Sequence, residues 1–157
     1  MKFKAITRQT TLGRFWEIVT DIGVAEAIEE QEVGIRSLRT FWSTCLWDTG
    51  ASHSSISKET SEALGIKPFG ETTVLSAQGE AIENCYLVSL NLPNLLFIPS
   101  VRVTQCATND IFGVIIGMDV ISKGDFALTN VNGVSTFSFC VPGMETIDYV
   151  DRITGKN

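Results

Sequence analysis

The chain has 157 residues, of which 44% are apolar and 19% are charged, and a formal net charge of −6. These values favour one globular domain with a buried core. Lys and Arg are scattered, so the basic stripe that binds nucleic acid is missing, and we expect no nucleic-acid partner. No apolar run approaches the roughly 18 residues that span a bilayer, and no signal peptide is recognisable. We therefore expect no membrane association and a cytoplasmic location.

Strand-like segments separated by short glycine and asparagine turns run through the chain and indicate an all-β fold. Residues 14–22 and 34–47 are rich in Phe, Trp, Ile, Val and Thr, which are typical of strands. Between them, residues 25–32 carry four Glu and lack strand character. We expect a long hairpin that ends in an acidic loop or one short helical turn.

Three tryptophans, Trp16, Trp42 and Trp47, fall within these two predicted strands. An aromatic binding face is one interpretation. Large aromatic side chains in strands more often fill a core or an interface, so we expect packing roles for all three.

The second strand leads into Asp48-Thr49-Gly50 and then into a predicted helix. Residues 58–64 should form about two helical turns, because Ser57 is a suitable N-cap and Gly65 can adopt the left-handed conformation that ends a helix. Two further strands, 71–76 and 80–92, are joined through Ala77-Gln78-Gly79, whose glycine can take the positive φ of a tight turn. These strands predict a projecting hairpin.

The last third of the chain continues the strand pattern at 95–98, 100–104 and 112–116. A short helix is predicted over 119–123, with Asp119 as its N-cap and Gly124 as its end. A final hairpin should pair 126–129 with 134–139 around Asn132-Gly133, a strong turn dipeptide. Residues 144–157 are polar without clear periodicity, and this tail could be frayed or could dock on a partner.

The four cysteines, Cys45, Cys85, Cys106 and Cys140, are widely spaced, and one histidine accompanies them. A zinc site or redox motif needs closer ligand pairs. We expect reduced, mostly buried thiols, no metal and no cofactor.

The Asp48-Thr49-Gly50 turn is the candidate for chemistry. Two carboxylates about 3 Å apart share one proton, so one can act as base towards a water while the other acts as acid, and an amide bond is cleaved without metal. Gly50 lets loops approach closely and its N–H can reach the carboxylate, while the Thr49 hydroxyl can tie one loop to its neighbour. The structural alternative is a simple Asx-turn between strands.

His53 is the only histidine, and it makes a nucleophilic mechanism with Ser52, Ser54 or Cys45 conceivable. Neighbouring residues on a strand point to opposite faces, which argues against such a triad. We interpret His53 as a surface or hydrogen-bonded structural residue.

Three features together resemble the retropepsin-like aspartic peptidases: residues 46–52 (LWDTGAS), the hairpin near Gln78, and residues 114–119 (VIIGMD) followed by a short helix. The resemblance covers about residues 41–139, and residues 115–130 look most like bacterial members. From the chain length we expect a single domain over 1–157, with its core at about 14–140 and a polar tail at 141–157. The resemblance implies an all-β, closed β-barrel fold with one or two short helices. It also implies a homodimer with the active site on the two-fold axis.

Carried over position by position, the resemblance implies that Asp48 is the catalytic carboxylate, Thr49 the cross-subunit hydrogen-bonding residue and Gly50 the close-packing turn residue. The residues implied to contact a polypeptide substrate are Ala51, Ser52, Ala77, Gln78, Gly79 and Ile116. Met118 stands where viral members carry an arginine. The chain has one such triplet, so an endopeptidase mechanism requires a second copy; a non-catalytic peptide-binding or dimerisation module on the same fold is the alternative.

Overall fold

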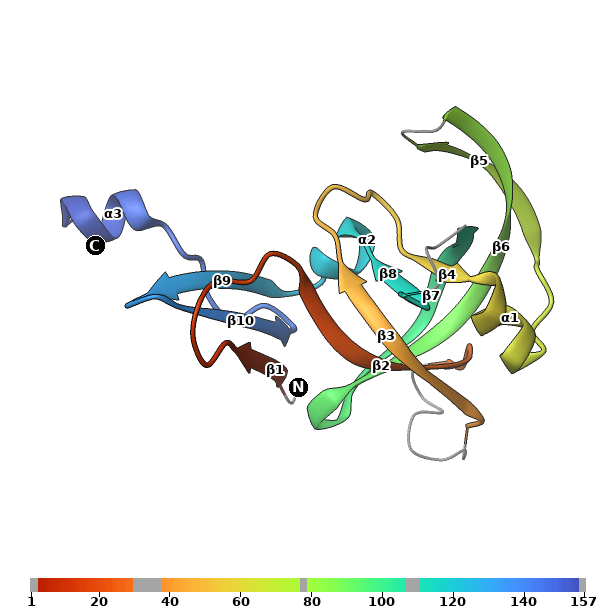
Figure 1. Ribbon diagram of the computed structural model, residues 1–157, viewed down its shortest axis with the longest axis horizontal. Helices are drawn as coiled ribbons and strands as arrows, with labels where there is room; N and C mark the ends of the chain where they lie inside the picture. The colour runs from red at the N-terminus through yellow and green to blue at the C-terminus, as the bar shows by residue number, and fades with distance from the viewer. Residues whose placement is uncertain (1–2, 30–37, 77–78, 107–110, 156–157) are drawn as a thin grey trace.

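The computed structural model describes residues 3–29, 38–76, 79–106 and 111–155 (Figure 1). In chain order the described elements are β1 (Lys4–Gln9), β2 (Ile18–Glu26), β3 (Thr40–Trp47), β4 (Ser55–Ser57), α1 (Lys58–Leu64), β5 (Gly70–Ser76), β6 (Gly79–Leu92), the 3-10 turn η2 (Pro93–Leu95), β7 (Leu96–Cys106), β8 (Val114–Ile116), α2 (Met118–Ile121), β9 (Asp125–Val131), β10 (Val134–Val141) and α3 (Tyr149–Thr154). Strands dominate the described residues, which confirms the all-β prediction.

A closed barrel forms the larger part of the molecule (Figure 1). Within the described ranges its six strands follow the order β2-β3-β8-β4-β7-β6, and pairing of β6 with β2 closes the ring. The β3–β8 and β4–β7 pairs are parallel. Strand β5 pairs with β6 outside the ring, so these two strands extend from the barrel as a hairpin. The predicted closed barrel and projecting hairpin are confirmed.

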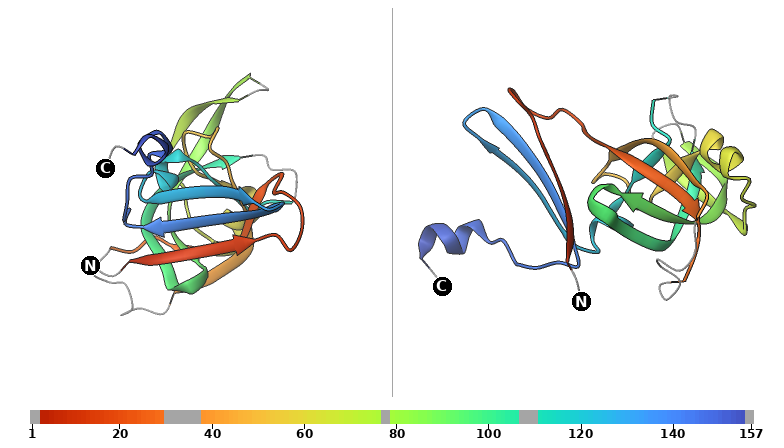
Figure 2. Two further views of the ribbon diagram at one scale, coloured as in Figure 1. Left: turned by 90° about the vertical axis from the view of Figure 1, so that its left-hand side faces the viewer. Right: turned by 90° about the horizontal axis from the view of Figure 1, so that it is seen from below.

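A second sheet stands beside the barrel and has the order β1-β10-β9 (Figures 1 and 2). Sequence reasoning did not predict β1, which pairs with β10 across most of the chain length, from Lys4 with Val141 to Gln9 with Thr136. Ile6 of β1 is buried together with Phe137 and Phe139 of β10. These side chains belong to the same apolar cluster as the barrel interior, so one core joins the two sheets.

Local signals correctly predict helix α1 and the turn of the last hairpin. Helix α1 has the predicted limits, with the Ser57 side chain accepting the Thr60 N–H and Gly65 in the left-handed region at φ 66°. The β9–β10 turn has positive φ at both Asn132 and Gly133, which is the backbone that an Asn-Gly hairpin requires.

The first predicted hairpin needs correction. Strand β2 begins at Ile18 rather than at residue 14 and continues through Glu26, into the stretch that lacked strand character in the sequence. Residues 13–15 are held elsewhere: the Gly13 N–H bonds the Gly133 carbonyl and the Phe15 N–H bonds the Ser135 hydroxyl. The last part of the predicted acidic loop lies outside the described residues.

We expected all three tryptophans to pack in a core or an interface, and within one chain this holds for one of them. Trp47 is buried, whereas Trp42 is 58% exposed and Trp16 is 95% exposed. The three side chains are equally hydrophobic, so hydrophobicity alone could not predict which one is buried. Trp47 faces the junction of the two sheets, while Trp42 covers Gly23 on the outside of the barrel.

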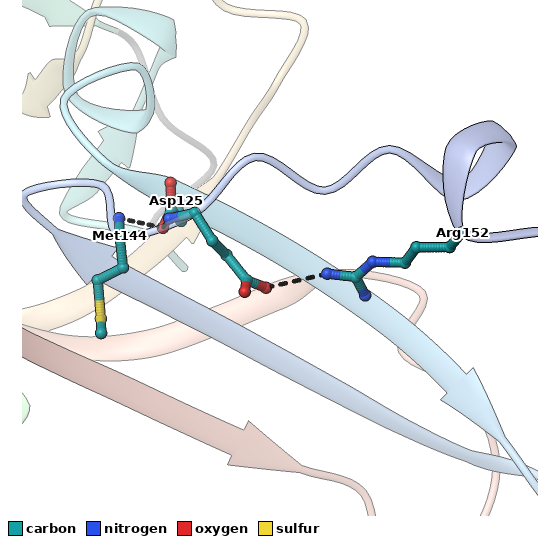
Figure 3. Close-up of polar contacts among 4 residues, drawn as sticks. Asp125, Met144 and Arg152 are labelled. Carbon is teal, nitrogen blue, oxygen red and sulfur yellow. Dashed lines mark hydrogen bonds and ion pairs between the residues drawn. The ribbon is translucent and has the colours of Figure 1, made fainter. Parts of the chain in front are cut away.

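The tail is partly ordered. Helix α3 follows Asp148, whose side chain caps the N–H groups of Val150 and Asp151. The Asp125 carboxylate accepts the N–H groups of Met144 and Glu145, and Arg152 bonds Glu145 Oε1 at 3.4 Å (Figure 3). The tail is thus tied to β9 while α3 projects beyond the sheet (Figure 2). None of the helices in the described ranges has the length and apolar character needed to cross a membrane.

Candidate active site

Asp48 is the first residue after β3, at the end of a buried strand. Its N–H donates to the Ile116 carbonyl of β8 at 2.9 Å, and its carbonyl accepts the Ala51 N–H at 3.2 Å. The first bond continues the parallel β3–β8 pairing, in which Trp47 lies opposite Ile116. The second bond closes a tight turn. Both ends of the Asp48–Ala51 turn are therefore fixed by backbone contacts.

Trp47 secures the strand immediately before this turn. Its ring lies 5.1 Å from the Phe137 ring and 4.9 Å from the Phe139 ring, measured between centroids. The indole Nε1–H donates to the Thr20 hydroxyl at 3.0 Å. Trp47 thus contacts β10 of the second sheet and β2 of the barrel at once, and the residue that precedes Asp48 has little freedom to move.

The carboxylate of Asp48 is held by its own turn. The Gly50 N–H donates to Asp48 Oδ1 at 2.8 Å, which confirms the contact expected from the sequence. A Cβ at position 50 would lie 3.1 Å from the same oxygen, so glycine leaves room for the carboxylate. Asp48 is half-buried, whereas Thr49 and Gly50 are exposed. The turn presents a rigidly held carboxylate at a surface.

The residues at the start of α2 lie directly against the loop that follows Asp48. The Met118 N–H bonds the Ala51 carbonyl at 2.8 Å and the Asp119 N–H bonds the Ser52 carbonyl at 3.2 Å. A Cβ on Gly117 would lie 2.7 Å from the His53 carbonyl carbon and 2.8 Å from the Ala51 oxygen. Only glycine permits this approach without moving the loop.

The predicted role of Asp119 as N-cap of α2 is wrong. The helix begins at Met118, and Gly117 occupies the N-cap position. Asp119 Oδ1 instead accepts the N–H and the hydroxyl of Ser54, at 2.9 and 2.7 Å. Sequence reasoning missed this pair, because its members lie 65 residues apart and an Asp just before a short apolar segment ordinarily signals a cap.

The remaining candidate residues lie in the hairpin, in the loop after Asp48 and in β8. Gly79 has φ 116°, which is the positive φ expected at the hairpin tip, while Ala77 and Gln78 lie outside the described residues. Ala51 is half-buried and Ser52 is exposed. Ile116 is fully buried, so within one chain it holds Asp48 through its carbonyl and offers no side-chain surface. His53 is exposed, in agreement with its interpretation as a surface residue.

The cysteines are free thiols, as expected: Cys45 and Cys85 are buried, and Cys106 and Cys140 are partly buried. Burial raises the pKa of the Cys45 thiol far above its ordinary value, and burial also raises the pKa of Cys106. A neutral thiol is a poor nucleophile. Over the described ranges, no three His, Cys, Asp or Glu side chains are grouped as metal ligands would be.

The closed barrel is the fold that the resemblance to retropepsin-like aspartic peptidases implies, and the Asp48-Thr49-Gly50 turn follows its strand β3. The family model described as aspartyl protease matches residues 43–120, a segment that includes both Asp48 and Asp119. The structure is similar to the crystal structure of a retropepsin-like aspartic protease from Rickettsia conorii, with a TM-score of 0.52 and 12% sequence identity over 90% of this chain and 97% of that chain. A comparison with curated protein sequences gave no match. Residues 43–120 thus match an aspartyl protease family model, and the chain has a retropepsin-like fold.

Proposed function

We propose that the protein is an aspartic endopeptidase whose active site forms when two copies of the chain bring their Asp48 carboxylates together. The observation that carries this proposal is the Asp48 turn itself, held by Ile116 and Gly50 and open to the surface at Thr49. One carboxylate cannot serve as base and acid in the same step. Two that share a proton can, because like charges at about 3 Å do not both ionise.

The reaction follows from this arrangement. The ionised carboxylate takes a proton from a water that lies between the pair as the water attacks the scissile carbonyl. The protonated carboxylate donates its proton to the developing oxyanion. In the resulting tetrahedral intermediate, the dyad donates its proton to the amine nitrogen and takes one back from a hydroxyl of the intermediate as the C–N bond breaks. The amine leaves, the new carboxyl product forms, and the two carboxylates again share one proton. The fixed Asp48 turn would supply the geometric precision that such proton transfers need.

The surface around Asp48 supports a second copy as the partner. Thr49 and Gly50 are exposed beside it. Ile18 pairs with Trp47, so the chain before β2 emerges at the same end of the barrel as Asp48, and Trp16 is 95% exposed there. A two-fold axis through this end would bury Trp16 and let the Thr49 hydroxyls bond across the interface.

The β5–β6 hairpin supports a polypeptide as substrate. Leu75 pairs with Glu80 and Thr73 with Ile82, which places the side chains of Leu75 and Ile82 on the same face of the hairpin. These two side chains are 78% and 73% exposed. An extended peptide could lie between this hairpin and the floor formed by Ala51 and Ser52, binding as an added strand. We expect apolar residues on both sides of the scissile bond.

A peptide library incubated from acid to neutral pH tests the proposal. The wild type should cleave between apolar residues, and Asp48→Asn should keep the fold but lose cleavage. Asp21→Asn makes the same change on an exposed position of β2 and should retain activity. Cleavage by Asp48→Asn at the wild-type rate would rule out the mechanism. Peptide binding without Asp48-dependent cleavage would identify a non-catalytic module instead.

A further inference from the structure

Asp119 and Ser54 form a hydrogen-bonded pair between the loop after Asp48 and helix α2. A single carboxylate oxygen, Asp119 Oδ1, accepts the Ser54 hydroxyl at 2.7 Å and the Ser54 N–H at 2.9 Å. Ser54 is fully buried and Asp119 is half-buried. Because one oxygen accepts both donors of Ser54, this pair fixes both the backbone and the side chain of Ser54.

The Ser54 hydroxyl makes a second contact, accepting the Gly117 N–H at 3.0 Å. The hydroxyl therefore uses its proton towards Asp119 and a lone pair towards Gly117. Two backbone bonds join the same segments: the Met118 N–H bonds the Ala51 carbonyl and the Asp119 N–H bonds the Ser52 carbonyl. Ser54 thus adds side-chain contacts to the backbone contact between residues 51–54 and residues 117–119.

The Asp119 carboxylate does not cap its own helix. The N–H groups at the start of α2 have other partners: Gly117 bonds Ser54, Met118 bonds Ala51, and Val120 bonds the Gly117 carbonyl. An Asp in a first helical turn ordinarily serves these groups. Here its carboxylate accepts hydrogen bonds from Ser54, so Asp119 restrains the loop that follows Asp48.

We propose that Asp119 and Ser54 are positioning residues that hold the Asp48 carboxylate in its reactive orientation. This inference rests on the proposed function of Asp48. Strand β8 fixes the start of the catalytic loop through Ile116, whereas residues 117–119 and Ser54 fix its far end. Between these two attachments the exposed Thr49-Gly50 apex has no buried side chain of its own to hold it. A displacement of about 1 Å at a reacting group can lower a rate about 100-fold.

Kinetics of four variants test the assignment, all measured on the full chain below its unfolding temperature. Ser54→Ala and Asp119→Ala should each lower kcat by about 10- to 100-fold, with a smaller change in KM, since the residues act on Asp48 and not on substrate. The double variant should be little worse than either single one, because both remove the same contact. Asp119→Asn keeps an acceptor oxygen and should recover most of kcat.

Ser57→Ala is the matched control. Ser57 is also buried and bonds Thr60, but it caps α1 and has no bond to residues 117–119. This variant should lose thermal stability while kcat keeps its value. The pH at which kcat is maximal should move in Asp119→Ala, because the spacing of the two Asp48 carboxylates changes, and should not move in Ser57→Ala.

Three results would overturn the inference: an unchanged kcat in folded Asp119→Ala, no recovery in Asp119→Asn, or an equal loss of kcat in Ser57→Ala. Each of these leaves Asp48-dependent cleavage by the wild type intact. Absence of Asp48-dependent cleavage in the wild type would instead overturn the proposed function, and this inference with it.

Discussion

Trp47 packs against Phe139 with ring centroids 4.9 Å apart, and this contact joins the strand that carries Asp48 to the β1-β10-β9 sheet. The Asp48 turn is thus supported from two directions. The contacts of Trp47 with Phe137, Phe139 and Thr20 fix the strand before Asp48. Residues 116–119 fix the turn and the loop after it. The second sheet therefore supports the candidate active site through its contacts with Trp47.

Replacement of Trp47 by Phe should lower the free energy of unfolding by about 2 kcal/mol, through lost packing and the loss of the hydrogen bond from the indole to the Thr20 hydroxyl. Trp42→Phe makes the same chemical change at a position that is 58% exposed and should stay within about 0.5 kcal/mol of the wild type. Urea titration measures both values. Equal effects of the two substitutions would contradict the assigned role of Trp47.

Gly117→Ala should lower kcat/KM at least about 100-fold, because the new methyl group would lie 2.7 to 2.8 Å from the backbone of His53 and Ala51 and would displace the loop. Gly70→Ala is the control, since a Cβ there meets nothing within 4 Å. Steady-state kinetics of both variants provide the measurement. A fully active Gly117→Ala would show that the loop tolerates displacement.

Much of the fold follows from local signals in the sequence, and the remainder depends on contacts between distant residues. Ser57 and Gly65 define α1, and Asn132-Gly133 defines the last hairpin, because caps and turns act over a few residues. Strand β1 is stabilised by pairing with β10, more than 120 positions away, and six residues carry no independent signal of that pairing.

In the candidate site too, contacts within one turn could be predicted from the sequence and contacts between distant residues could not. Asp48 and the Gly50 N–H contact could be predicted, since both lie within one turn. The bond from Asp119 to Ser54 could not, because nothing local states which loop lies beside α2. Helix α3 had local signals, an Asp148 N-cap and a left-handed Gly155, but its six residues are too short to produce a visible period.

Stability should decline at alkaline pH through Cys45. Burial raises the pKa of this thiol above its ordinary 9.0, so the folded state keeps the proton that the unfolded chain loses. The contribution of the protonated Cys45 thiol to the free energy of unfolding is complete below pH 9 and falls by about 1.4 kcal/mol per pH unit above it. Cys45→Ala should reduce this slope between pH 9 and 10.5. Val114→Ala, a buried control paired with Cys45, should lower stability at every pH without changing the slope.

Asp125→Ala should release the tail, because it removes the acceptor for the Met144 and Glu145 N–H groups. Limited proteolysis should then cut within residues 142–148 faster than in the wild type, with little change in the unfolding midpoint. Asp148→Ala removes the α3 cap and leaves the Asp125 contacts in place, so its additional cuts should fall within α3. Identical cleavage patterns for the two variants would contradict the anchoring role of Asp125.

The central claim is that each chain supplies half of a catalytic pair, and subunit mixing tests it most directly. A fixed amount of wild type is equilibrated with increasing Asp48→Asn, and peptide cleavage is measured with substrate in large excess. If both Asp48 residues are needed, mixed dimers are inactive, and nine equivalents of Asp48→Asn should lower activity to about one tenth. Addition of nine equivalents of wild type in place of Asp48→Asn should raise the cleavage activity. Activity that stays constant as Asp48→Asn is added would show that one chain carries a complete site and would contradict the account.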